Sequence, residues 1–414
     1  MKNDVWEGIQ ILENVPVPCQ SNCLGVFKIH VKNQLLALKI IQHPVEDQEE
    51  AHYFHKLHRK EPELMIPIES YFPTFIPIVN YFTGDPLKLD YPPIKDKLQN
   101  PLTPELELPL MDYYFLLTPI YHETLPSFWK NLANFSFEEE LYVLYQVVMT
   151  LDYLHNSQIV HGDLRGDNIW IFTDPKSPEN YLRIGVASFG LGNTPAESNT
   201  GLNDEDHFLS KFNQEYLPPE LKSEESRGKW VSSLRVPDVE VTFWQLLQGL
   251  DSWSIGMSLL EMYMCKSRDD VLFFYEDLQN SIEGGSVKAK EYFESLPSTV
   301  PFPVKRLAKH LLSLDPYDRD FDECLFFLGV ELWIIPELAN SPAFSNAEGW
   351  RSAPKADLQK GISDIFQAVS VEIDEAVSKV SVNTWYNYCK LNWFAKMGCY
   401  MESKIPDYVH IPTI

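Results

Sequence analysis

The chain has 414 residues, of which 44% are hydrophobic and 22% are charged, as is typical of a globular protein of two or three packed units. Its 34 basic and 59 acidic residues give a net charge of −25. Such a chain lacks the excess positive charge with which proteins neutralise nucleic acid phosphates or anionic lipids. We therefore expect no nucleic acid partner and no membrane attachment.

The first residues of the chain and its cysteines bear on the cellular compartment and on metal binding. The sequence MKNDVWEGIQ at the start has no apolar signal-peptide core, which predicts a cytoplasmic protein. Six cysteines are too few for a disulfide scaffold, and only Cys19 and Cys23 lie close together. We expect reduced thiols and no structural metal.

The first part of the chain predicts a small sheet. Apolar-rich runs at Val26–Val31 and Leu35–Ile41 flank Lys32-Asn33 and predict a tight hairpin. A helix is expected over Glu46–Leu57, and strands over Phe75–Phe82 and Tyr113–Thr118. Between these strands, the Pro-rich residues of about 84–109 predict a long surface insertion.

A helical part follows Pro119. Ser136, with Glu139 three residues later, fits a capping box before a run of apolar residues at helical spacing. Short strands are expected over Ile169–Phe172 and Ile184–Val186, and further helices over Asp251–Met264, Val304–Leu314 and Phe321–Trp333.

The tail beyond Ile335 differs from the rest. Apolar residues recur at steps of three and four from Leu358 to Val380, which predicts an amphipathic helix. Packing against its own domain is the favoured interpretation, and binding of a partner is the alternative.

The segment His161–Asn168 (HGDLRGDN) carries residues suited to phosphoryl transfer. That reaction needs an acid to accept the hydroxyl proton and an amide oxygen to hold a metal, and Asp163 and Asn168 have the required spacing. The segment resembles the catalytic loop of the protein kinase superfamily. Small-molecule phosphotransferases use a similar string, so the segment alone does not decide between them.

Landmarks on either side follow the order found in protein kinases. Ala37-Leu38-Lys39 resembles the strand whose lysine holds the nucleotide phosphates, and Glu50 resembles the glutamate that pairs with that lysine. The resemblance also implies ATP contacts by Gly25 and, at the hinge, by Ile120 and Tyr121. His161 and Phe189 match members of the hydrophobic spine.

Three later landmarks are absent from small-molecule kinases. Tyr216–Glu220 is similar to the Ala-Pro-Glu segment, and Asp251–Gly256 to the helix that anchors the large lobe. Arg319 matches the arginine that pairs with the glutamate, here Glu220.

The resemblance implies an α+β, bilobal protein-kinase-like fold. We expect a sheet-rich N-lobe over 1–118, a helical C-lobe over 119–335 and a helical C-terminal extension over 336–414.

The sequence departs from the family where nucleotide and metal bind. Ser188 stands in the place of the magnesium-binding aspartate, and magnesium prefers anionic oxygen. With Gly25 aligned to the third glycine of the phosphate loop, Gln20 and Asn22 replace the first two, and Phe27 takes the position that lies on adenine. Gly162 replaces an arginine that captures phosphate.

Two functions follow from these departures. The favoured one is a pseudokinase, a regulatory scaffold that binds a protein partner. The alternative is a weakly active Ser/Thr protein kinase, a transferase that uses ATP with Lys39, with Asp163 as base and with magnesium held by Asn168. The kinase resemblance implies ATP and magnesium, and the departures argue against both. A small-molecule kinase is disfavoured by the segment at Glu220 and the helix at Asp251.

Overall fold

The computed structural model describes residues 9–15, 23–31, 34–44, 76, 80–83, 85, 89, 91–94, 111–120, 123–130, 135–173, 182–187, 216–222, 243–264, 292–313, 315–344, 349–379 and 385–398. The chain divides into two compact units. The first comprises Met1–Ser127, Ile159–Ile171 and Gly185–Leu202. The second comprises Phe128–Gln158, Phe172–Ile184 and Asn203–Ile414.

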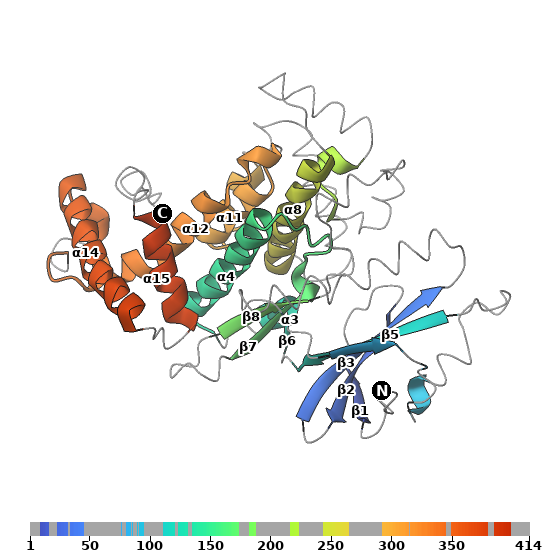
Figure 1. The fold of residues 1–414 in the computed structure, drawn as a ribbon. Helices are drawn as coiled ribbons and strands as arrows, with labels where there is room; N and C mark the ends of the chain where they lie inside the picture. The colour runs from blue at the N-terminus through green and yellow to red at the C-terminus, as the bar shows by residue number, and fades with distance from the viewer. Residues whose placement is uncertain are drawn as a thin grey trace. The chain divides into compact units, whose positions relative to one another are not determined.

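The first unit contains a five-stranded antiparallel sheet of order β1-β2-β3-β5-β4 (Figure 1). Its strands are β1 (Gln10–Val15), β2 (Cys23–Val31), β3 (Gln34–Pro44), β4 (Asn80–Thr83) and β5 (Met111–Pro119). The predicted hairpin and the predicted strand before Pro119 are therefore confirmed. The predicted helix over Glu46–Leu57 lies outside the described residues.

The two faces of this sheet differ. Phe27, Ile29 and Leu38 are buried on one face, where they form a core with Phe115 and neighbouring apolar residues. Because successive side chains of a strand point to opposite faces, the residues between them lie on the other face. That second face carries the predicted site residues of β3.

Part of the predicted insertion belongs to this core. Leu89 is 4% exposed and Ile94 is fully buried, and both pack in the cluster that contains Phe27. The prediction of a surface stretch is wrong for these two residues. Apolar side chains within a Pro-rich stretch gain more from burial beside the sheet than from exposure to water.

A second, three-stranded sheet has the order β6-β7-β8. Its strands are β6 (Glu123–Thr124), β7 (Ile169–Thr173) and β8 (Leu182–Val186). The helix α3 (Leu125–Lys130) follows β6, and a single 3₁₀ turn, η3 (Gly166–Asn168), leads into β7. The two short strands expected from the sequence are thus present.

The second unit is helical. Its longer helices are α4 (Phe137–Asn156), α8 (Phe243–Met264), α11 (Phe302–Leu311), α12 (Phe321–Gly329), α14 (Lys355–Lys379) and α15 (Trp385–Met397). Shorter elements are η6 (Pro219–Leu221), η7 (Pro316–Asp318), α13 (Ile335–Asn340) and η9 (Trp350–Ser352).

Helix α4 begins as the sequence predicts. The Ser136 hydroxyl accepts a hydrogen bond from the Glu139 amide at 3.2 Å, and the Glu139 carboxylate accepts one from the Ser136 amide at 2.7 Å. This reciprocal pair satisfies two amides that the first turn leaves without helical partners.

The helix expected over Phe321–Trp333 changes character at its end. Residues Val330–Ile334 form a π-helical turn, η8, between α12 and α13. The indole of Trp393 lies directly against Gly329, and its Nε1 donates to the Leu325 carbonyl at 2.9 Å. A side chain from α15 therefore occupies the surface of α12 just before the helix widens.

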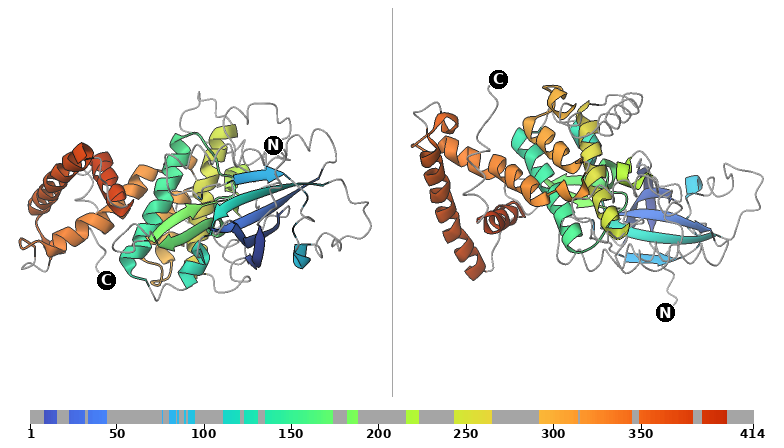
Figure 2. Two further views of the ribbon diagram at one scale, coloured as in Figure 1. Left: turned by 60° about the horizontal axis from the view of Figure 1, so that its bottom comes forward. Right: turned by 90° about the horizontal axis from the view of Figure 1, so that it is seen from above.

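Helix α15 also packs on α4. The Trp385 indole donates to the Gln146 amide oxygen at 3.0 Å, and the Tyr386 ring meets the Tyr142 ring edge-on. Lys396 pairs with Asp152 of α4 at 3.0 Å and with Asp322 of α12 at 2.6 Å. Figure 2 shows α14 and α15, in red, together at one end of the helical unit.

The amphipathic helix predicted from Leu358 onward is α14. Leu358, Ile362 and Val369 are buried, which agrees with packing on its own domain, whereas Val371 is 58% exposed. Among the described residues, no helix combines the length and the apolar character needed to cross a membrane.

These elements confirm the predicted α+β class, with a sheet-rich unit and a helical unit. The buried thiols of Cys324 and Cys389 are free. The predicted domain limits at 118/119 and 335/336 stay predictions.

Candidate active site

The predicted catalytic loop joins α4 to β7. The Asp163 carboxylate accepts a hydrogen bond from Asn168 Nδ2 at 2.9 Å and pairs with Arg165 Nε at 3.3 Å. Asn168 Nδ2 also donates to the Asp163 carbonyl at 2.6 Å. With its side chain 10% exposed, Asp163 is held by two neighbours in its own loop.

His161 anchors this loop to the segment after β8. Its ring is fully buried, with Nε2 lying 2.9 Å from the Ala187 carbonyl. Nδ1 accepts from the Asp163 amide at 3.2 Å, so the proton of the neutral ring resides on Nε2. The pKa of His161 is lowered to about 4, chiefly because burial disfavours the charged ring. The hydrogen bond to the Ala187 carbonyl opposes this shift, and the charge of Lys39 adds to it.

A backbone hydrogen bond also joins the end of the catalytic loop to the segment after β8. The Ala187 amide donates to the Asn168 carbonyl at 3.0 Å. The segment that leads to Ser188 is therefore tied to both ends of the catalytic loop.

Gly162 has a structural reason to be glycine. Its φ is +81°, in the region that L side chains rarely adopt. The sequence suggests only the loss of an arginine here. The structure adds that this backbone conformation would strain any side chain at position 162.

Lys39 and Ala37 lie on the second face of the large sheet. Val26 is paired directly with Lys39 across β2 and β3, and Leu116 is paired with Lys39 across β5. Residues directly opposite in neighbouring strands share a face. Val26 and Leu116 are thus apolar neighbours of Lys39, and neither was predicted from the sequence.

The predicted adenine contact of Phe27 is wrong. Phe27 pairs with Leu38, is 1% exposed, and meets the Tyr91 ring edge-on in the core on the opposite face. The register of β2 against β3 shifts between Cys23 and Gly25. Val26, opposite Lys39, lies on the face expected for Phe27, so the glycine alignment is wrong by one residue, and a one-residue shift exchanges the faces.

Several predicted site residues fall outside the described residues. They are Gln20, Asn22, Glu50, Tyr121, Ser188 and Phe189. Gly25 is buried in β2, and Ile120 directly follows β5. The expected Lys39–Glu50 pair and the expected hinge contact of Tyr121 therefore stay predictions.

The donors present fit magnesium poorly. Asn168 uses its amide nitrogen on Asp163, which leaves the neutral amide oxygen as its possible metal ligand. The partner position holds the Ser188 hydroxyl in place of a carboxylate. Magnesium prefers anionic oxygen ligands in octahedral arrangement. Within the described ranges, no group of three or more His, Cys, Asp or Glu residues is arranged to hold a metal.

The later landmarks form a buried ionic centre in the second unit. Arg319 pairs with Glu220 at 2.8 Å, and each side chain is 1% exposed. Arg319 also donates to the Gly249 carbonyl at 2.7 Å and to the Ser313 carbonyl, and its guanidinium lies 5.2 Å from the Trp253 ring centre. Asp251 is buried at 4% exposure in α8.

Three features, in this order along the chain, are typical of one class of phosphoryl-transfer proteins: the lysine of β3, the loop that holds Asp163 and Asn168, and the buried pair of Glu220 and Arg319. The family model for protein tyrosine and serine/threonine kinases matches residues 111–325. The chain belongs to the protein kinase family.

Similar proteins include fungal kinases at low identity. The mitogen-activated protein kinase spm1 of Schizosaccharomyces pombe is 24% identical over 217 residues, covering 47% of this chain and 45% of the relative. The mitogen-activated protein kinase KSS1 of Saccharomyces cerevisiae is 28% identical, covering 42% of this chain and 44% of the relative.

A third relative matches over a shorter region. The meiosis-specific serine/threonine-protein kinase MEK1 of Saccharomyces cerevisiae is 31% identical over 126 residues, which cover 30% of this chain and 23% of the relative. In all three, the aligned part spans less than half of the relative.

Proposed function

We propose that this kinase-family chain is a pseudokinase that acts as a scaffold for a protein partner. The observation that supports it is an imbalance between two parts of the chain. Contacts typical of an assembled kinase core are present among the described residues, with Arg319 buried against Glu220 and His161 fixed between Asp163 and Ala187. The metal donors are reduced to Asn168 and the Ser188 hydroxyl.

The reduced donor set matters because of the charge on the transferring group. In kinases, metal ions bridge the phosphates and neutralise the charge that develops during transfer. A site without a second carboxylate supplies little of this stabilisation. We accordingly propose a binding protein that recognises its partner without phosphorylating it, with the cytoplasm as its expected location.

A weak Ser/Thr kinase is the second candidate, and the catalytic loop favours it. Asp163 Oδ2 lies 2.9 Å from Asn168 Nδ2, so the carboxylate is held in place by its partner in the loop. Asp163 would accept the proton of an acceptor hydroxyl. Arg165, beside Asp163, occupies the place of the lysine typical of Ser/Thr kinases, and one relative, MEK1, is by name a serine/threonine-protein kinase.

A nucleotide titration separates the two functions. Thermal stability is measured with ATP alone, with magnesium and with manganese, for the parent chain and for Asp163→Asn. A ligand at a hundred times its Kd stabilises the folded state by about 2.7 kcal/mol, which a thermal shift detects readily. The scaffold predicts no magnesium-dependent shift and no autophosphorylation. A saturable Mg-ATP shift, together with autophosphorylation that Asp163→Asn abolishes, would establish the kinase instead.

The same assay tests the defect at Ser188. Ser188→Asp adds the missing carboxylate, yet we expect little gain from it alone, because Asn22 also departs from the phosphate loop. Ser188→Asp with Asn22→Gly is expected to bind Mg-ATP more tightly than either single variant. Strong Mg-ATP binding by the parent would contradict this account.

A further inference from the structure

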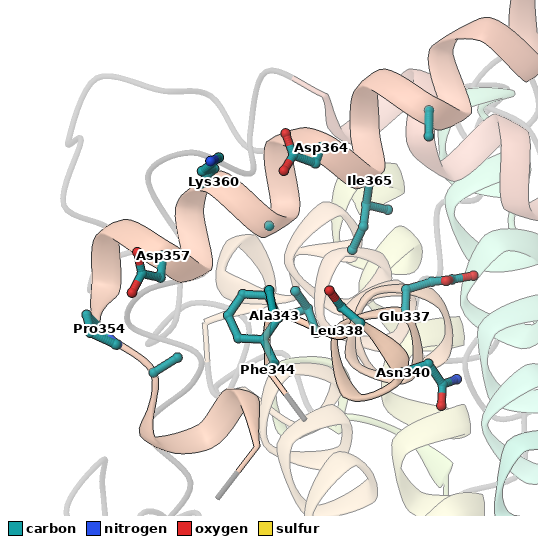
Figure 3. Close-up of a pocket in the computed structure, with 14 residues that line it drawn as sticks. Glu337, Leu338, Asn340, Ala343, Phe344, Pro354, Asp357, Lys360, Asp364 and Ile365 are labelled. Atoms are coloured by element: carbon teal, nitrogen blue, oxygen red, sulfur yellow. The ribbon is translucent and has the colours of Figure 1, made fainter. Parts of the chain in front are cut away.

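The helices α13 and α14, with residues between them such as Phe344 and Pro354, line a half-open cavity of about 530 Å³ that is far in the sequence from the catalytic loop (Figure 3). The volume is within the range of roughly 300–1,000 Å³ found for ligand sites. The cavity lies entirely in residues beyond the matched kinase region, between Glu337 and Ala368. The kinase family therefore does not account for it.

The floor and wall of the cavity are apolar. Leu338 and Phe344 are buried at 1% and 4% exposure, and Ile365 of α14 is half-buried beside them. Figure 3 shows these three side chains in the space between the two helices. An apolar side chain placed here would gain by leaving water.

The rim of the cavity is acidic. Glu337, Asp357 and Asp364 are exposed and line the cavity, and Lys360 is the cation among its lining residues. Throughout the described residues, none of these three carboxylates takes part in an ion pair. The rim thus carries a net charge of about −2 above an apolar floor, and this combination is complementary to a basic, amphipathic partner.

The spacing of the acidic residues along α14 indicates which sequence pattern a helical partner would need. Asp357 and Asp364 are seven residues apart, which is about 10 Å along a helix with a rise of 1.5 Å per residue. Cations seven residues apart on a second helix have the same separation. Apolar residues at the third and fourth positions after the first cation share its face and reach the floor.

We propose that the cavity between α13 and α14 docks a basic amphipathic helix of a protein partner. The groove does not suit a second copy of this chain, because two chains of net charge −25 repel each other. This inference deepens the proposed scaffold function by giving its partner a chemistry. The binding test below does not involve ATP, so its failure is distinguishable from a failure of that function.

The probe is a fluorescein-labelled, alanine-based peptide of about 18 residues, long enough to be helical. It carries Arg at positions i and i+7 and Leu at i+3 and i+4. A second peptide has the same composition in scrambled order. Fluorescence anisotropy with the full chain at low and physiological salt gives the affinity of each peptide.

The variant Asp357→Asn/Asp364→Asn removes two rim charges without changing side-chain size. Ile365→Ser removes an apolar contact and leaves the charge unchanged. The control Glu372→Gln/Asp318→Asn removes two exposed carboxylates outside the cavity. Circular dichroism and thermal melting verify that each variant is folded.

We expect the ordered peptide to bind more tightly than the scrambled one. The rim variant is expected to weaken binding about fivefold at low salt, as befits two solvent-screened ion pairs. Ile365→Ser should weaken it at both salt concentrations, and the control should leave it unchanged.

Equal binding of both peptides, or equal weakening by the control, would show non-specific attraction to an acidic protein and would overturn the proposal. Absence of binding would overturn it as well. Concentration-dependent dimerisation that Ile365→Ser abolishes, measured by sedimentation, would assign the groove to a second copy instead.

Discussion

Replacing Gly329 by alanine should destabilise the protein, although alanine is the better helix former. An ideal Cβ at position 329 would overlap Cε2 and Nε1 of the Trp393 indole. No real Cβ approaches so closely. Trp393 is 1% exposed and donates to the Leu325 carbonyl, so its ring cannot move without losing burial and a hydrogen bond.

The two effects of this substitution have opposite signs. Alanine within a helix gains roughly 0.5–1 kcal/mol over glycine. Displacing a buried tryptophan costs about 3–5 kcal/mol when the ring is removed outright. We expect a net destabilisation of about 2–4 kcal/mol, which corresponds to a fall in Tm of about 4–8 °C for the helical unit.

A double-mutant cycle isolates the clash. Gly329→Ala, Trp393→Ala and the double variant are compared with the parent by thermal and urea unfolding, followed by far-ultraviolet circular dichroism. Once Trp393 is alanine, Gly329→Ala should cost nothing or stabilise by up to about 1 kcal/mol. A stabilising Gly329→Ala in the parent background, or additive effects in the cycle, would refute the reasoning.

Three further perturbations test other contacts. Burial raises the pKa of Glu140 to about 7, so the folded state holds its proton more tightly than the unfolded state and loses stability as pH rises from about 4.5 to 7. Glu140→Gln should therefore gain about 1–3 kcal/mol over the parent at pH 8 and nothing near pH 4, measured by urea unfolding at each pH; a pH-independent difference would contradict this. Arg319→Ala leaves Glu220 buried and unpaired and should lower the free energy of unfolding by about 3–5 kcal/mol. Arg306→Ala breaks a partly exposed pair with Glu323 and should lower it by about 1 kcal/mol or less. Equal losses for the two variants in urea unfolding would contradict this difference. Phe27→Val should lower stability by about 1–3 kcal/mol and leave ATP affinity unchanged in calorimetry, because the ring lies on the face opposite Lys39; tighter ATP binding would return Phe27 to the nucleotide site.

Local patterns in the sequence predicted local structure well. The capping box at Ser136 and the hairpin around Lys32-Asn33 depend on residues that are neighbours in the chain, and both the helix and the strand pair are present. The spacing of Asp163 and Asn168 likewise predicted two side chains that the structure brings together.

Features set by register or by distant contacts were not predictable in the same way. Aligning Gly25 with the third glycine of the phosphate loop placed Phe27 in the nucleotide site, because the sequence does not show which residue of β2 lies opposite Lys39. The Trp393–Gly329 contact joins residues 64 positions apart, and no periodic pattern links them. The backbone conformation of Gly162 was not predictable either. The sequence shows that glycine replaces arginine, but it does not show that the backbone at this position requires glycine.

The packing of α15 on α4 has a consequence for how the chain is made. Tyr142 of α4 and Cys389 of α15 are in contact, yet 247 positions separate them. At about 5–20 residues per second, a ribosome needs roughly 10–50 s to synthesise that interval. Throughout that time the aromatic surface of α4 lacks its covering helix, so the nascent chain is a natural client for chaperones that hold apolar segments until synthesis delivers their partner.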